Sequence, residues 1–181
     1  DMCRANALVA VKRAGSGHLG SSFSALDLVA HLLFRELNVA ELGWDDPDRD
    51  VFFSSKGHDV PGLYAALYAH GVVPRERFIN LRRLGGTHGH PDLSVPGIEA
   101  NSGSLGMGIS KAKGMALANR LSDIERRIYV LTGDGELQEG QFWESLGSAA
   151  NRGLGEIIVI IDHNKIQSDT WVRSVSDLGD L

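Results

Sequence analysis

The chain has 181 residues, of which 43% are hydrophobic, and its 18 basic and 23 acidic residues give a net charge of −5. This composition suffices for one hydrophobic core, and the interspersed charges do not indicate nucleic-acid binding. The longest purely aliphatic run, residues 157–161, is too short to span a bilayer. Cys3 is the only cysteine, which excludes an internal disulfide and favours a reducing compartment such as the cytoplasm.

The first part of the chain predicts two helices joined by a glycine- and serine-rich loop. Residues 4–14 have a helical pattern, and residues 16–22 form the loop that carries His18. Ser24 is expected to cap the second helix. A lone loop histidine is usually solvated, so His18 by itself receives no functional assignment.

The middle of the chain predicts one buried strand, three helices and two further histidine-bearing positions. The strand covers residues 51–55 and leads to His58, which places this histidine at the sheet edge where ligands collect. His88 and His90 lie in a glycine-rich loop. The helices are expected at residues 61–70, 74–81 and from the segment beginning at 101 to about 121.

Two further apolar runs each lead to an oxygen donor. Residues 128–132 lead into Asp134, and residues 157–161 lead into Asn164. Both runs have the length and β-branched character of buried parallel strands, whose carboxyl ends meet at the ligand-binding edge of an open α/β sheet. Asp134 and Asn164 are therefore expected to share one site.

The oxygen donors at this edge suit a small hard cation. The Asp134 carboxylate, the Asn164 amide oxygen and the main-chain carbonyl of Ile166 are ligands of the kind that Mg²⁺ shares with substrate phosphates. Gly133 and Gly135 allow a bulky anion to approach the backbone, and the helix predicted after this turn would offer unpaired N–H groups. The residues predict an Mg²⁺-bridged diphosphate.

Five short segments occur in an order that is specific to one family. They are Ser-Gly-His at 16–18, Ser-Lys-Gly-His at 55–58, Gly-His-Pro at 89–91, Gly-Ser-Leu-Gly-Met-Gly at 103–108, and Gly-Asp-Gly at 133–135 with Asn164. Together they resemble the diphosphate-binding half of a transketolase, most of all the N-terminal subunit of a split transketolase. The resemblance covers roughly residues 15–169. It implies an α/β fold with a doubly wound, mostly parallel sheet flanked by helices, in one thiamine diphosphate-binding domain over residues 1–181.

The resemblance also implies a role for each matching residue. Asp134, Asn164 and the Ile166 carbonyl would hold Mg²⁺. His18 and His90 would face the substrate, where an imidazole with an unperturbed pKa of about 6.5 can move protons at neutral pH. The family transfers a two-carbon ketol unit from a ketose, or its phosphate, to an aldose. The residues expected to contact thiamine diphosphate are His58, Gly103, Leu105, Gly133, Gly135, Glu136 and Asn164.

Several positions depart from the family pattern. Leu19 stands where proline is usual, Ser104 and Met107 replace proline and glutamine, and Glu136 occupies a position that is often cysteine in full-length enzymes. None of these changes removes a metal ligand or a motif histidine. The pattern therefore predicts cofactor binding and leaves the sugar substrates undefined.

One half of the family's active site has no counterpart in the sequence. The glutamate that protonates the aminopyrimidine ring lies in a separate pyrimidine-binding domain, and no segment here resembles that domain. The resemblance therefore implies a partner subunit, in an assembly such as a heterotetramer, with the cofactor between the two chains. Because the sequence opens at Asp1 and ends abruptly, we also expect a chain trimmed at its C-terminal end. Neither a nucleic acid nor a membrane is an expected partner.

Four alternatives stay open at this stage. The turn at Asp134 could be a simple hairpin, although the residues after it are not strand-like. His18, His58, His88 and His90 could form a zinc site, since imidazole is a preferred zinc ligand. The chain could serve another thiamine diphosphate enzyme, such as deoxyxylulose phosphate synthase, a 2-oxoacid dehydrogenase or a biosynthetic acyl or ketol transferase. It could also be a transketolase-like assembly subunit without catalysis.

Overall fold

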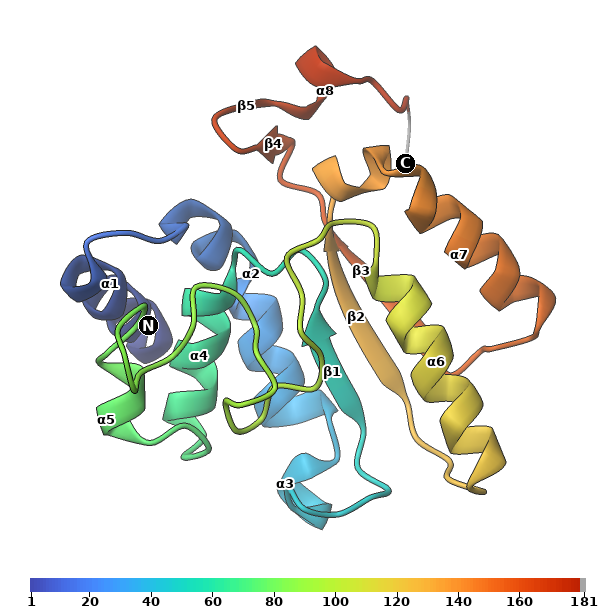
Figure 1. Cartoon of the computed structure of the whole chain (residues 1–181), viewed down its shortest axis with the longest axis horizontal. Coiled ribbons are helices and arrows are strands. Elements are labelled where there is room, and N and C mark those ends of the chain that lie inside the picture. The colour runs from blue at the N-terminus through green and yellow to red at the C-terminus, as the bar shows by residue number, and fades with distance from the viewer. Residues whose placement is uncertain (180–181) are drawn as a thin grey trace.

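The computed structural model describes residues 1–179 and has a parallel three-stranded sheet at its centre (Figure 1). The strand order is β1 (Val51–Ser54), β2 (Ile128–Gly133) and β3 (Ile157–Asp162). The register pairs Val51 with Ile128 and Ile128 with Ile157. The carboxyl ends of β2 and β3 therefore lie side by side, as the sequence predicted.

Helices cover both faces of this sheet. The helices are α1 (Met2–Ala14), α2 (Leu19–His31), α3 (Val39–Leu42), α4 (Val60–Ala69), α5 (Arg75–Phe78), α6 (Gly108–Leu121), α7 (Gly140–Asn151) and α8 (Val172–Val175). The α1, α2 and α4 helices lie on one side of the strands, and α6 and α7 lie on the other (Figure 1). This arrangement confirms the predicted α/β class with helices on both faces.

Alternate strand residues supply the two hydrophobic cores. Phe52, Tyr129 and Leu131 pack in the core under α1, α2 and α4. Phe53 and Val130 point the opposite way, into the core under α6 and α7. Since successive side chains of a strand project to opposite faces, an almost continuous apolar run is what a sheet covered on both faces requires.

The start of α2 corrects one prediction. The helix begins at Leu19, so Ser24 lies inside it rather than at its cap. The Ser22 hydroxyl donates to the His18 carbonyl oxygen at 2.8 Å, and the Ser22 amide bonds the same oxygen at 3.1 Å. These bonds draw the serine-rich segment into the first turn of the helix, and His18 becomes the residue directly before it. The helix then continues into a π-helical turn, Leu32–Glu36.

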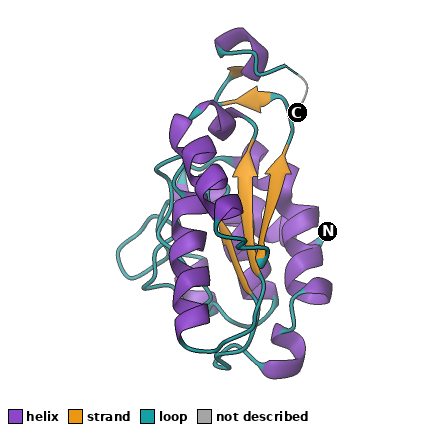
Figure 2. Ribbon diagram, turned by 90° about the vertical axis from the view of Figure 1, so that its right-hand side faces the viewer, coloured by secondary structure: helices purple, strands orange, loops and turns teal. Residues whose placement is uncertain are grey.

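The Asp134 turn is not a hairpin. Asp134 is followed by a 3₁₀ turn, Gly135–Gln138, and then by α7. The antiparallel pair in this region is instead formed by β4 (Ile166–Gln167) and β5 (Thr170–Trp171). This pair and α8 project beyond the carboxyl edge of the main sheet (Figures 1 and 2). The hairpin alternative is therefore wrong.

The described residues after α8 do not begin another helix. Residues 176–179 are not helical, and residues 180–181 lie outside the described part of the chain. Among residues 1–179, the helices are all too short or too polar to cross a bilayer.

Candidate functional site

A cavity of about 570 Å³ lies at the carboxyl ends of β2 and β3, and the segment that begins α2 forms another part of its wall. Most of the predicted site residues line this cavity, although they come from five separate parts of the chain. His90 and Gly103 are the two predicted residues that do not line it. The predicted residues that line it are His18, His58, Leu105, Gly133, Asp134, Gly135, Glu136, Asn164 and Ile166.

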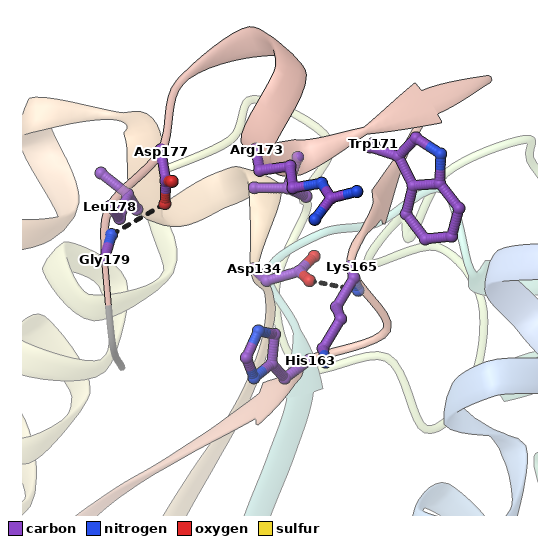
Figure 3. Close-up of a pocket in the computed structure, with 9 residues that line it drawn as sticks. Asp134, His163, Lys165, Trp171, Arg173, Asp177, Leu178 and Gly179 are labelled. Atoms are coloured by element: carbon purple, nitrogen blue, oxygen red, sulfur yellow. Dashed lines mark hydrogen bonds between the residues drawn. The ribbon is translucent and has the colours of Figure 1, made fainter.

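Asp134 is held by the backbone on both sides of its carboxylate. The residue is only 2% exposed. One carboxylate oxygen accepts from the Gly135 amide at 2.9 Å, and the other accepts from the Lys165 amide at 2.6 Å. Lys165 has a positive φ of 66°, which lets the loop after β3 fold onto Asp134. Figure 3 shows this contact between Asp134 and the Lys165 amide.

Asn164 has a defined orientation in the same loop. Its Oδ1 accepts from the Ile166 amide at 2.8 Å, and its Nδ2 lies 3.4 Å from Asp162 Oδ2. The amide oxygen and the amide nitrogen therefore point to different partners. The loop brings Asp134, Asn164 and Ile166 to one side of the cavity, so the structure brings together the three residues predicted to hold a cation.

His58 and His18 line the cavity next to each other. Their rings meet edge to face with centroids 5.2 Å apart. His58 Nδ1 lies 2.7 Å from the Lys56 carbonyl oxygen, so this nitrogen donates and Nε2 is left for other partners. Burial lowers the pKa of His58, and the charge of Asp59 opposes that effect. His18 is exposed at the cavity edge.

His90 and Gly103 lie against each other outside the cavity wall. A Cβ atom added at Gly103 would come within 2.7 Å of His90 Cδ2, so only glycine leaves room for the imidazole. Gly103 also has a φ of 124°, which favours glycine. Burial lowers the pKa of His90, and the positive charges of Arg82 and His18 lower it further.

Glu136 is a buried carboxylate whose oxygens already have protein partners. It lines the cavity, yet it accepts hydrogen bonds from the Ser55 hydroxyl, from the Gly106 amide at 2.8 Å and from the Gly133 amide at 3.3 Å. Burial raises the pKa of Glu136. The side chain ties three of the motif segments together, which is a structural role that the sequence did not indicate.

Two polar residues of this cavity, among those to which sequence reasoning assigned no role, have surroundings that suit a ligand. Ser21 lines the cavity, and its buried hydroxyl has no hydrogen-bond partner among residues 1–179. Lys56 also lines it and is only 2% exposed, with its ammonium group 2.5 Å from Asp162. A buried hydroxyl without a partner and a buried cation are suited to an anionic ligand. Both residues lie within segments that the sequence singled out, but only the structure shows their surroundings.

The four histidines do not form a zinc site. Within residues 1–179, there is no group of three or more histidine, cysteine or acidic side chains placed to hold a metal ion. His88 is exposed and lies 3.2 Å from the Ser94 hydroxyl, away from the cavity. The zinc alternative therefore lacks support, and His88 has no assigned role.

A second cavity of about 440 Å³ lies next to Asp134, on the side of β5 and α8. Figure 3 shows the side chains of His163, Lys165, Trp171 and Arg173 around it. It shares only Asp134 with the first cavity. The predicted site residues other than Asp134 all lie elsewhere, so the first cavity is the candidate functional site.

Close backbone packing at Gly57 leads to a testable prediction. Gly57 has a φ of 65°, and a Cβ atom there would lie 2.7 Å from the Gly103 amide nitrogen. Gly57→Ala should therefore destabilise the fold by about 1 to 3 kcal/mol, because alanine strains the left-handed backbone and pushes the Gly103 loop away. Thermal unfolding measures this loss. Gly155→Ala is the matched control, since its added methyl group meets nothing within 4 Å; equal melting temperatures for the two variants would contradict the prediction.

The comparisons with known proteins agree on one family. A family model described as transketolase, thiamine diphosphate binding domain, matches residues 1–177. The 6-deoxy-6-sulfo-D-fructose transketolase subunit SqwG of a Clostridium species is 38% identical, over 100% of this chain and 66% of that protein. An apulose-4-phosphate transketolase subunit from Actinobacillus succinogenes is 40% identical, over 88% of this chain and 58% of that protein.

Solved structures give the same result for the fold. A transketolase variant from Pichia stipitis superposes with a TM-score of 0.85 at 34% identity, over 99% of this chain and 28% of that one. Transketolase from Leishmania mexicana gives a TM-score of 0.81 at 32% identity, over 92% and 27%. The chain thus spans about two thirds or less of its subunit relatives and about a quarter of these long enzymes.

Proposed function

The chain belongs to the transketolase family, and we propose that it is the diphosphate-binding subunit of a two-subunit enzyme that transfers a two-carbon ketol unit from a ketose, or its phosphate, to an aldose. One observation supports this proposal above the others. Nine of the predicted site residues, from four of the five motif segments and the positions beside them, line a single cavity at the carboxyl edge of the sheet. Such edges are where ligands bind in open α/β folds.

The residues of the cavity fit thiamine diphosphate and Mg²⁺. Asp134, the Asn164 amide oxygen and the Ile166 carbonyl would hold Mg²⁺, because they are hard oxygen donors on one side of the cavity. His58 Nε2 and the unpartnered Ser21 hydroxyl are available to the diphosphate. The other proposed cofactor contacts are Gly103, Leu105, Gly133, Gly135 and Glu136.

In the proposed reaction, the protein positions its ligands and moves protons. Bound thiamine diphosphate would supply the nucleophilic carbon and the electron sink needed to break and form the carbon–carbon bond. His18, at the cavity edge, and His90, beside Gly103, would orient the sugar hydroxyls. The lowered pKa of His90 favours its neutral form, which can accept a proton from a hydroxyl group.

A partner chain is part of this proposal. Two relatives are named as subunits, and the domain over residues 1–181 is proposed to be the diphosphate half alone. The partner would carry the pyrimidine-binding domain and its glutamate, in an assembly such as a heterotetramer with the cofactor between subunits. The cytoplasmic location stays a prediction from the single cysteine.

Co-purification tests the proposal. We expect native mass spectrometry of the complex from its own cells to show a second polypeptide, thiamine diphosphate and Mg²⁺. The complex should transfer ketol units between sugar phosphates, and the chain alone should be inactive because it lacks the partner's glutamate. Apulose 4-phosphate and 6-deoxy-6-sulfofructose, which the relatives' names mention, are suitable donors to include. Release of CO₂ from pyruvate without any ketose consumption would instead support another thiamine diphosphate enzyme.

A further inference from the structure

The buried ion pair between Lys56 and Asp162 lies next to Asn164, one of the proposed metal ligands. Lys56 follows β1 and Asp162 ends β3, and the ammonium nitrogen is 2.5 Å from Asp162 Oδ2. The Lys56 and Asp162 side chains are 2% and 10% exposed. Breaking such a pair from one side leaves a buried charge without compensation, so the two residues act as a unit.

Asp162 is in contact with a proposed metal ligand but is not itself part of the cavity wall. Its Oδ2 accepts from the Ser24 hydroxyl at 2.6 Å and lies 3.4 Å from Asn164 Nδ2. Asn164 Nδ2 also lies 3.3 Å from the Ser24 hydroxyl. These contacts draw the amide nitrogen of Asn164 toward Asp162, so its amide oxygen points away from Asp162.

Lys56 supplies positive charge to a cavity wall that otherwise carries acidic side chains. Among the described residues that line the cavity, it is the only lysine or arginine, while Asp134, Glu136 and Asp169 are acidic. Without Lys56, the Asp162 carboxylate would lose the cation that neutralises it, and a negative charge would remain two residues from Asn164. The carboxylate would then repel a diphosphate, and it could turn toward a cation as a competing ligand.

We propose that Lys56 and Asp162 are a positioning pair for cofactor binding: Asp162 orients the Asn164 amide toward the cation, and Lys56 neutralises Asp162. The inference rests on the proposed function, since it concerns how the same cavity holds Mg²⁺ and a diphosphate. Groups behind the direct ligands of a metal commonly change its affinity by about 10- to 100-fold when they are removed. Neither residue needs to touch the cofactor for this effect.

A double-mutant cycle in the assembled complex tests the pair. The variants are Lys56→Met, Asp162→Asn and the double variant, and calorimetry measures the dissociation constant of thiamine diphosphate at a fixed Mg²⁺ concentration. We expect each single substitution to weaken binding by about 10- to 100-fold. The double variant should bind no worse than the weaker single variant, because it contains no unpaired buried charge. The Mg²⁺ concentration needed for thiamine diphosphate to bind should be raised in each single variant and closer to the wild-type value in the double variant.

The controls separate three outcomes. Lys113→Met removes a lysine that bonds Ser148 between α6 and α7, so it should leave the affinity unchanged. Losses that multiply in the double variant would show that Lys56 and Asp162 act independently, which overturns the pairing. If Lys56→Met does not fold, Asp162→Asn alone decides, and wild-type affinity there also overturns it. Failure of the wild-type complex to bind thiamine diphosphate would count against the proposed function instead.

Discussion

Asp134→Ala is expected to abolish Mg²⁺-dependent binding of thiamine diphosphate in the assembled complex. Asp134 is the only charged side chain among the three proposed metal ligands, and Mg²⁺ depends on such oxygen donors. Substitution of groups behind a metal ligand costs about 10- to 100-fold in affinity, so loss of the ligand itself should cost more than about 100-fold. Calorimetric titration of the complex with thiamine diphosphate, with and without Mg²⁺, measures this loss.

The Asp134 carboxylate also supports the fold, so the test needs a structural control. Its two oxygens accept from the Gly135 and Lys165 amides, and both bonds disappear in the alanine variant. Asp134→Asn keeps one acceptor oxygen while removing the charge, and it should fold yet still bind Mg²⁺ poorly. Asp48→Ala, in the loop before β1 at the opposite end of the sheet, should bind like the wild type. Tight binding by a folded Asp134→Ala complex would refute the metal assignment.

Much of the candidate site could be predicted because Asp134 and Asn164 come shortly after strands in the sequence. The apolar runs before Asp134 and Asn164 form β2 and β3, and parallel pairing places their ends together without further information. Glycine positions such as Gly135 were also readable, because the need for backbone access is local. A residue that stands immediately after a recognisable strand can therefore be placed from sequence.

Contacts between distant segments could not be predicted in the same way. Lys56 and Asp162 are separated by 106 positions, and no local pattern links them. The packing of His90 against Gly103 is likewise a tertiary contact. The start of α2 was missed for a different reason. Serine is common at helix caps, but here Ser22 and Ser24 lie inside the helix, and the Ser22 hydroxyl bonds the carbonyl oxygen of His18, four residues earlier.

His90→Ala should separate catalysis from cofactor binding. His90 lies outside the cavity wall, so its removal should change the dissociation constant of thiamine diphosphate by less than about threefold, well below the cost of losing a contact at a metal site. General acid–base groups contribute about 10²- to 10⁴-fold to turnover, so kcat should fall by at least about 100-fold. His88→Ala is a matched control from the same loop, because His88 lies beside Ser94 and Asp92, outside the cavity wall, and its removal should leave kcat unchanged.

The pH profile adds a readout that a purely structural role for His90 would not change. Burial, Arg82 and His18 lower the pKa of His90 from its usual value of 6.5, so the proposed base loses activity only as the pH falls below that value. Arg82→Gln removes a nearby positive charge, which should raise the pKa of His90 and move the acid limb of kcat to higher pH. If His90→Ala weakens cofactor binding as much as turnover, His90 belongs to the cofactor site. An acid limb that does not move in Arg82→Gln would assign the proton transfer to another group, with His18 the next candidate at the cavity edge.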